Sequence, residues 1–516
     1  MRSFAQRLFK GLRRRPADGA VESRASDPRV TDASPPTAPK VVGTAALWSV
    51  GNAFTAQAIS LLAFLVTARF ISPEAFGLVA VATLLVELVK RILVEPLAIR
   101  LMAMNNPGQR DYDDCFSHIV LLGVLGVLLI LLVAEPLAIL VDLPGLPIIL
   151  YVMSGMMLVM GLSRTHEVWY SKRYEFRLLA IRSSSAAILG GATGVGMALA
   201  GFGVWSLVAQ QLVTTAAAYV LLFLLSKWRP RFRLAVGESV RNLLQVKHLV
   251  FSNVVGFAGS QADVFFVTSS LGAAAGGLYS AAKRLILAAN LIVINSVQGV
   301  ILTSFAERNR SPRAYQIHLD SLEIFALVIT PLFVGLAVLS EDVISVLLSP
   351  AWLASGAILR PLAYAALGGG LNLLVFNYLV AAGAERSRTA VVVGTALVTV
   401  AALPVVAPSG AVAVAWFMAA MAWLSLFVLS GAAALRSEVS VLQPLQALLL
   451  PAAGAVAMLG LAALIDLQAT SFLRLLIMPP ALLLAYLCVV SLLGFATKAR
   501  AAVHFRNAVG RLGRER

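Results

Sequence analysis

Two short stretches of the sequence decide the fold: residues 71–78, ISPEAFGL, and residues 271–278, LGAAAGGL. Each stretch follows an apolar segment, predicts a tight turn, and leads into another apolar segment that starts with Gly-Leu. The two stretches are 200 residues apart. A repeat at this distance predicts two lobes of like orientation, as in transporters that are built from parallel repeats.

Outward from these turns, apolar segments follow one another along most of the chain. Of its 516 residues, 59% are apolar and only 13% are charged, and the mean hydropathy is +0.87. Because a membrane-crossing helix needs about 20 mostly apolar residues, we expect an all-α polytopic membrane protein with about fourteen transmembrane helices. Their expected ranges are 44–68, 76–100, 117–140, 147–163, 178–199, 205–225, 248–270, 276–303, 321–339, 355–382, 389–406, 411–433, 445–465 and 472–494.

The Lys and Arg residues of the loops predict the orientation, because these residues are enriched on the cytoplasmic side. The segments predicted inside carry 1, 4, 6, 3, 2 and 1 of them, at 102–116, 164–177, 226–247, 306–320, 384–388 and 435–444. The seven segments predicted outside hold only Arg69. Both tails are basic as well, so both termini are expected to be cytoplasmic and attracted to anionic lipid headgroups. The net charge of +16 is therefore mainly a topology signal and predicts no nucleic-acid partner.

The same pattern predicts the domain organisation. We expect a disordered basic tail at 1–40, an N-lobe of helices 1–6 at 41–226 and a cytoplasmic linker at 227–247. A C-lobe of helices 7–12 is expected at 248–434, two further helices at 435–496 and a basic cytoplasmic tail at 497–516.

No catalytic or metal-binding motif is present. The sequence lacks GxxxxGK[ST], HExxH and GxSxG, and Cys115 and Cys488 form no CxxC motif. We therefore expect no catalytic residue, no metal and no cofactor. The longest loop predicted outside, 340–354, contains no Lys, Arg or His. Such a loop is too small to hold the acceptor and donor of a membrane glycan polymerase or ligase, which disfavours an enzyme.

Ionisable residues inside the expected spans are the main functional signal, because each is costly in lipid unless it faces protein or water. There are eight basic and five acidic ones. Glu87, Lys90, Arg91 and Glu95 share one face of the second helix, about 140° wide. Arg91 stands i,i+4 to both Glu87 and Glu95, so an intrahelical ladder of ion pairs is the structural alternative to ligand binding.

The seventh and eighth helices place Asp263 at a similar depth to the adjacent cations Lys283 and Arg284. An ion pair between Asp263 and one cation is again the structural alternative, but it leaves one positive charge uncompensated. A surplus cation in a membrane cavity favours a phosphate or diphosphate ligand. We therefore expect Lys283, Arg284, Lys90 and Arg91 to bind the diphosphate of a substrate.

Uncharged polar residues on the first and eighth helices form two further polar faces. The candidates for contacts with sugars are Asn52, Gln57, Asn290, Asn295 and Gln298. Hydrogen bonds between helices are the alternative explanation for such residues.

Four motifs carry a family resemblance: ARFISPEAFGL at 68–78, KRYEFR at 172–177, GFGVWSLVAQ at 201–210, and Asp263 followed by GLYSAA at 277–282. Over residues 42–435 the chain resembles the bacterial polysaccharide transporters and oligosaccharide flippases, Wzx or WzxC-like. These belong to the multidrug/oligosaccharidyl-lipid/polysaccharide flippase superfamily.

The resemblance implies a two-lobe transporter in the bacterial cytoplasmic (inner) membrane. Its substrate would be an undecaprenyl-diphosphate-linked oligosaccharide or a related polysaccharide, moved outward by alternating access for surface or exopolysaccharide biosynthesis. Related flippases draw on ion gradients, which makes Asp263 and Glu87 candidates for ion coupling. Membrane lipid and other polysaccharide assembly proteins are the expected partners.

The alternative is an ion-coupled small-molecule efflux antiporter of the same superfamily. Cationic substrates of such a protein would favour an acidic cavity, whereas the expected spans hold more basic than acidic residues.

Overall fold

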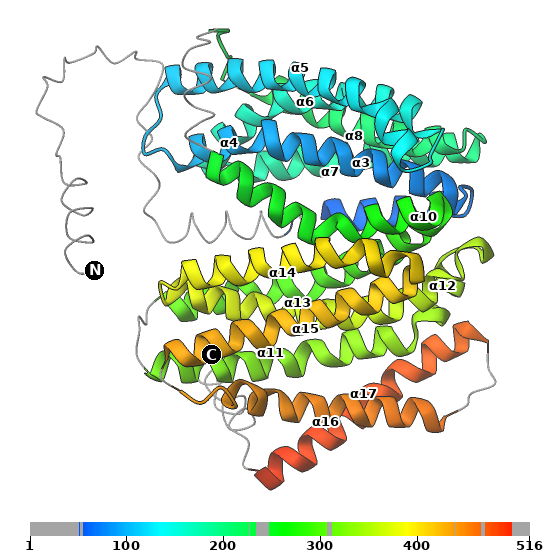
Figure 1. The fold of residues 1–516 in the computed structure, drawn as a ribbon, viewed down its shortest axis with the longest axis vertical. Coiled ribbons are helices and arrows are strands. Elements are labelled where there is room, and N and C mark those ends of the chain that lie inside the picture. The colour runs from blue at the N-terminus through cyan, green and yellow to red at the C-terminus, as the bar shows by residue number, and fades with distance from the viewer. Residues whose placement is uncertain are drawn as a thin grey trace, which may run out of the picture. The chain divides into compact units, whose positions relative to one another are not determined.

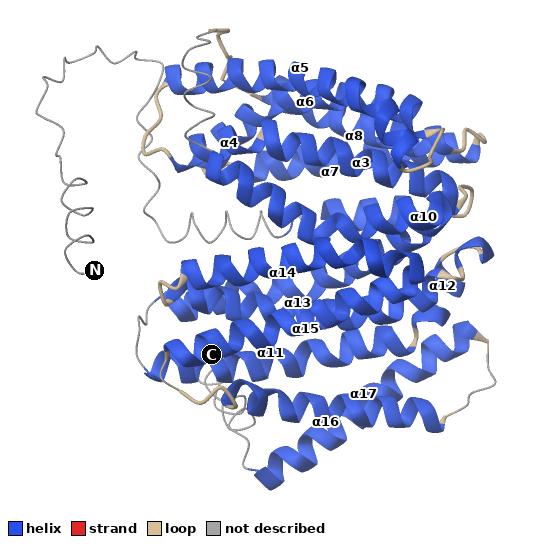
Figure 2. Cartoon of the chain, in the orientation of Figure 1, coloured by secondary structure: helices blue, strands red, loops and turns tan. Residues whose placement is uncertain are grey.

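The computed structural model describes residues 51, 55–226, 228–233, 247–306, 312–437, 439–465 and 470–497. All of them belong to one compact unit, Thr37–Arg516. Within these residues every regular element is a helix, and no strand occurs (Figure 2). The all-α prediction is therefore confirmed. The basic tails predicted at 1–40 and after Thr497 lie outside the described residues.

The first helix group contains a short helix, Thr55–Thr67, and the helices α3 to α8 (Figure 1). The strongest packing within it joins α5 with α6, α7 with α8, and α6 with α3 and α8. The bounds are α3 Pro73–Leu93, α4 Glu95–Ala103, α5 Gln109–Leu140, α6 Leu146–Lys172, α7 Phe176–Leu199 and α8 Val204–Leu225.

The second helix group contains α11 to α17. Here α13 packs on α11 and α15, and α16 packs on α11 and α17. The bounds are α11 Pro312–Val338, α12 Ser340–Leu347, η1 Pro350–Trp352, α13 Ser355–Ala381, α14 Glu385–Val406, η2 Ala407–Ser409, α15 Ala411–Arg436, α16 Gln443–Leu464 and α17 Ser471–Thr497.

The helix α10, Lys247–Ala306, joins the two groups, because it packs on α3 and also on α13 and α14. It consists of two helices that meet at Gly272, whose φ of 86° lies in the region that favours glycine. The two halves fold against each other, because Lys283 in the second half contacts Ser260 and Asp263 in the first. These halves correspond to the predicted helices 248–270 and 276–303.

Eleven helices within the described residues are long and apolar enough to cross a membrane. The helix α3 is not among these eleven, because it carries three charges in its last two turns. The two halves of α10 are counted as one span, from Asn253 to Asn290. Large side chains such as Ile139 and Leu464 are 80% and 85% exposed, as expected for surfaces that face lipid. The chain is therefore a multi-pass membrane protein. The number of fourteen spans and the cytoplasmic position of both termini stay predictions.

One predicted helix, 76–100, is wrong as a single element. It is divided into α3 and α4 at Val94. Pro96 occupies the first turn of α4, and a proline there has no N–H to continue the hydrogen-bond ladder of α3. Glu95 is therefore the first residue of α4 and not part of α3.

Three connections that the sequence predicts inside emerge on one side of the molecule. Figure 1 shows those between α4 and α5, α13 and α14, and α15 and α16 at its left-hand side. We call this side the basic face. The predicted division into lobes at 41–226 and 248–434, with two further helices at 435–496, stays a prediction.

Candidate functional site

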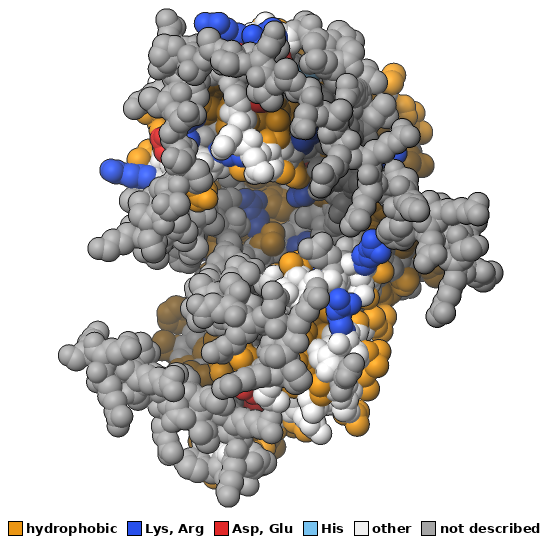
Figure 3. All heavy atoms as spheres, turned by 90° about the vertical axis from the view of Figure 1, so that its left-hand side faces the viewer, with side chains coloured by type: hydrophobic (Ala, Val, Ile, Leu, Met, Phe, Trp, Pro, Cys, Tyr) orange, Lys and Arg blue, Asp and Glu red, His pale blue; other side chains and the backbone are white. Residues whose placement is uncertain are grey.

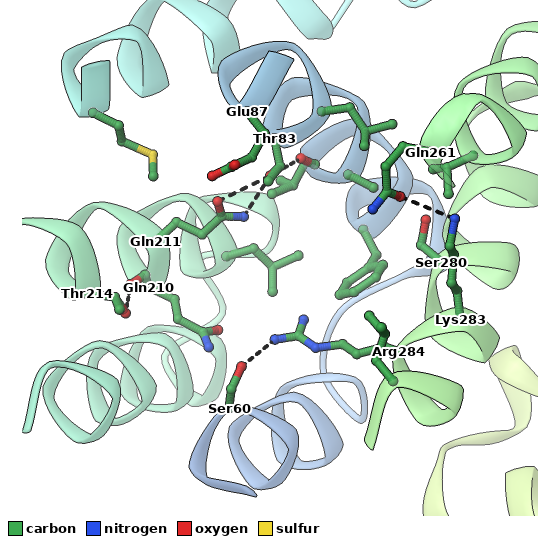
Figure 4. Close-up of a pocket in the computed structure, with 18 of the residues that line it drawn as sticks. Ser60, Thr83, Glu87, Gln210, Gln211, Thr214, Gln261, Ser280, Lys283 and Arg284 are labelled. Carbon is green, nitrogen blue, oxygen red and sulfur yellow. Dashed lines mark hydrogen bonds between the residues drawn. The ribbon is translucent and has the colours of Figure 1, made fainter. Parts of the chain in front are cut away.

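A cavity of about 500 Å³ lies where the helix Thr55–Thr67, α3, α6, α8 and α10 meet (Figure 4). Its walls combine apolar side chains such as Phe76, Val79 and Met156 with a set of polar ones. The polar residues are Gln57, Ser60, Thr83, Glu87, Gln210, Gln211, Thr214, Thr215, Gln261, Ser280, Lys283 and Arg284. A concave apolar site with a few convergent polar groups is typical of a ligand-binding site.

Arg284 is the cation of this cavity that has no carboxylate partner among the described residues. Its guanidinium donates a hydrogen bond to the hydroxyl of Ser60, 2.8 Å away. It also lies over the ring of Phe64, 4.9 Å from the centroid, which is a cation–π contact. Figure 4 shows the guanidinium pointing toward Ser60 across the cavity. These neutral contacts orient the charge without neutralising it.

Lys283 has a different partner, because it forms the ion pair with Asp263 that was predicted as the structural alternative. The ammonium lies 2.7 Å from a carboxylate oxygen, and Asp263 is 1% exposed. The same carboxylate accepts a hydrogen bond of 2.9 Å from the hydroxyl of Tyr279. Lys283 also donates to the carbonyl of Ser260 and to the side chain of Gln261. Of the two adjacent cations, Arg284 therefore carries the surplus charge.

Neutral side chains of α8 form a second wall that the sequence analysis missed. Gln210, Gln211, Thr214 and Thr215 line the cavity, and Gln211 exchanges hydrogen bonds with Thr83 of α3. Their i,i+4 spacing places them on one helix face. Helical spacing, which marks the polar faces of the first and eighth expected helices, is the signal that could have found them.

The ladder of ion pairs predicted along the second helix is wrong. Glu87 pairs with Lys90 at 2.9 Å, and Glu95 pairs with Arg164 of α6 at 2.7 Å. Glu95 is the first residue of α4, and its ion pair is with α6 and not with Arg91. Arg91 lies over the ring of Phe257 at 5.1 Å. Of the predicted residues in this region, only Glu87 lines the cavity.

The remaining sequence candidates divide into two kinds. Asn52 and the side chains of Asn295 and Gln298 lie outside what the structure describes. Asn290 is described and does not line the cavity, and its carboxamide oxygen is buried without a hydrogen-bond partner among the described residues. Of the predicted sugar contacts whose side chains the structure describes, Gln57 lies on the cavity wall.

Residues 71–78 and 271–278 meet at the end of the molecule opposite the basic face. Gly77 of α3 and Gly277 of α10 approach so closely that a Cβ at Gly77 would overlap the carbonyl of Ala273, and one at Gly277 would overlap that of Pro73. Trp352, which is fully buried, donates its indole N–H to the carbonyl of Ala68 at 2.7 Å. It packs edge-on against Phe64 and Phe76. The two helix groups are thus tightly joined at this end.

The basic face, at the other end of the molecule, is hollowed. Figure 3 views the molecule from this face and shows a hollow between the upper and lower parts, with Lys and Arg side chains on its walls.

Comparisons with solved structures identify the fold. The lipid II flippase MurJ in an inward closed conformation aligns over 87% of this chain and 99% of its own, with a TM-score of 0.72 and 16% identity. An inward-facing multidrug resistance transporter of the MATE family aligns over 74% and 94%, with a TM-score of 0.52 and 14% identity. At such identities the likeness shows the fold alone.

Comparisons of sequence identify the family. The succinoglycan biosynthesis transport protein ExoT of Rhizobium meliloti is 29% identical over 314 residues, which are 59% of this chain and 62% of ExoT. The amylovoran biosynthesis protein AmsL of Erwinia amylovora is 28% identical over 260 residues, or 49% of this chain and 67% of AmsL. The chain therefore aligns with about two thirds of these relatives' own length. Residues 66–357, more than half of the chain, match the family described as polysaccharide biosynthesis protein, and the chain belongs to that family.

Proposed function

We propose that this protein is a flippase of the bacterial inner membrane. It moves undecaprenyl-diphosphate-linked oligosaccharide, or a related polysaccharide, to the outer leaflet by alternating access. The charge of Arg284, which has no carboxylate partner among the described residues, is the observation that carries this proposal; apart from Glu87 and Lys283, the other polar side chains of the cavity are neutral. A guanidinium binds phosphate oxygens through two parallel hydrogen bonds, and the amides and hydroxyls of α8 suit the hydroxyl groups of sugars.

The family and the relatives support transport in preference to catalysis. ExoT is named as a biosynthesis transport protein. The loop predicted at 340–354 contains α12 and η1, and Trp352 at its end is fully buried. This loop packs on the helices and provides no separate catalytic domain, so a glycan polymerase or ligase is disfavoured.

The proposed roles follow from the contacts. Arg284 receives the diphosphate and Lys283 adds a second, partly neutralised charge. Gln57 and the polar residues of α8 meet the first sugars. Asp263 is paired with Lys283. A diphosphate bound beside Lys283 would weaken this ion pair, and Asp263 is therefore a candidate for ion coupling. Glu87, paired with Lys90, is the second candidate for that role.

The test replaces Arg284 in a strain that lacks the native gene. Arg284→Gln is expected to lower export of the surface glycan about tenfold or more, because a hydrogen bond to a charged group contributes about 1.5–3 kcal/mol. Arg284→Lys keeps the charge and should retain part of the export. Export and the amount of protein in the membrane would be measured together.

Arg386→Gln is the matched control, since Arg386 is exposed near the start of α14 and does not line the cavity. Normal export by Arg284→Gln at a normal protein level would contradict the proposal. Loss of cationic drug efflux by the same variant, with normal glycan export, would instead identify the efflux antiporter.

A further inference from the structure

The segment that follows α8 is a basic and aromatic ribbon, residues 228–233, WRPRFR. It has no regular secondary structure, yet it is fastened to α5 at several points. The Trp228 indole donates to the side chain of Gln109 at 3.1 Å. The backbone N–H of Arg231 donates to Asp113 at 3.1 Å, and that of Arg233 donates to the hydroxyl of Ser117 at 2.8 Å.

Trp228 anchors the ribbon at its start. Its side chain is buried, and it packs against Tyr112, Phe116 and His166. Arg229 turns back toward α8, where it donates to the carbonyl of Phe223 and lies over the ring of that residue. A cation at the end of a helix satisfies carbonyls that have no partner within the helix. These contacts fix the backbone and leave the later side chains outside.

The depth of the ribbon in the membrane follows from the length of α5. This helix has 32 residues, which extend about 48 Å, whereas the hydrocarbon core is about 30 Å thick. The excess is at the start, where Arg110, Asp111, Asp113 and Asp114 precede the apolar run that begins near Ser117. Because the ribbon runs from Gln109 to Ser117, Arg231 and Arg233 are held at the level of the lipid headgroups.

The exposed side chains of residues 231–233 have the charge and polarity that suit an anionic lipid. Arg231 and Arg233 are exposed, and neither forms an ion pair among the described residues. The buried acid Asp113 accepts hydrogen bonds from Gln109 and from the Arg231 backbone, and the Arg231 charge acts on it without forming an ion pair. Phe232 between them is 59% exposed and touches Phe116 edge-on. Figure 3 shows Lys and Arg side chains at the upper edge of the basic face, at the height of α5 in Figure 1.

We propose that residues 228–233 form a binding site for an anionic phospholipid, with Arg231 and Arg233 on the headgroup phosphate and Phe232 at the start of the acyl chains. Two cations beside an exposed aromatic ring at the membrane interface favour this ligand over a soluble anion. The site is separate from the central cavity, since none of its residues lines that cavity.

The test titrates the full-length protein in detergent with phosphatidylglycerol that carries a fluorophore on an acyl chain, and binding is measured by anisotropy. The double variant Arg231→Gln and Arg233→Gln keeps both backbone N–H donors, so the ribbon stays fastened. Its affinity is expected to fall about 30-fold, since each basic residue near an anionic surface contributes about 1 kcal/mol. Phosphatidylcholine is expected to compete poorly with the labelled lipid.

The control variant neutralises two other exposed basic residues, Lys247 and Arg386, and should bind as the unchanged protein does. Equal losses in both double variants would overturn the proposal in favour of a general charge effect. Displacement of the lipid by inorganic phosphate at similar concentration would overturn it in favour of a soluble anion. Unchanged affinity in the ribbon variant would also overturn it.

Discussion

The ion pair between Asp263 and Lys283 ties the two halves of α10 together. Asp263 is 1% exposed and keeps hydrogen bonds from Tyr279 and from the backbone of Val264. Lys283→Met would leave a buried carboxylate without its cation, which is strongly unfavourable. We expect this single variant to lower the free energy of unfolding by about 3 kcal/mol, measured by thermal unfolding of the detergent-solubilised protein.

The matched control for that variant removes both charges. Lys283→Met combined with Asp263→Asn leaves no unpaired charge, and the Asn oxygen still accepts from Tyr279, so most of the lost stability should return. If the double variant were as unstable as the single one, packing of the Lys283 side chain and not its charge would explain the loss.

At the level of residues, the sequence predicts charges better than neutral polar groups. The ion pair between Asp263 and Lys283 confirms that they lie at a common depth. Their positions along the two helices predict this depth, and a charge inside a membrane protein needs a partner. The glutamines and threonines of α8 share a helical spacing but were not predicted, because hydrogen bonds between helices explain neutral polar residues in a span equally well. The partner of Glu95 could not be predicted from its own helix, since it is Arg164 of α6.

At the scale of elements, the contact between α3 and α10 depends on two glycines. A Cβ at Gly277 would overlap the carbonyl of Pro73, so Gly277→Ala must push the two helices apart. We expect a loss of about 1–3 kcal/mol in stability, the usual range for overpacking, again from thermal unfolding.

Gly394→Ala is the control for this contact. Gly394 also lies inside a helix, α14, but a Cβ there meets no atom within 4 Å. Alanine favours a helix over glycine by about 1 kcal/mol, so this variant should be no less stable than the unchanged protein. Similar losses at both positions would show that the close approach of α3 and α10 is not responsible.

The existence of the helices was predictable from hydropathy, and their ends were not. Hydropathy marks only the part of a helix that lies in lipid, so α5 begins at Gln109 and not at 117. The division at Val94 had a signal in Pro96, which the apolar residues on both sides outweighed. The bend at Gly272, in contrast, falls between the predicted helices 248–270 and 276–303, because the small residues of 271–277 marked a turn there.

At the scale of the molecule, the two ends differ in packing. Gly77, Gly277 and Trp352 lie in close contacts at the end opposite the basic face, while the basic face is hollowed (Figure 3). The basic loops predict that the hollowed face is cytoplasmic, and we predict that the cavity is reached from that face. A side chain on the cavity wall should therefore react with reagents from the cytoplasmic side alone.

Gln210→Cys tests this access, because Gln210 lines the cavity from α8 (Figure 4). Cys115 and Cys488 are free thiols and would first be replaced by serine. A membrane-impermeant thiol reagent should label the new cysteine in inverted vesicles and leave it unlabelled in intact spheroplasts. Glu341→Cys on α12 should show the reverse, since Glu341 is exposed in the loop predicted outside. Labelling of Gln210→Cys from the outside only would mean that the end opposite the basic face lies on the cytoplasmic side, and it would reverse the predicted orientation.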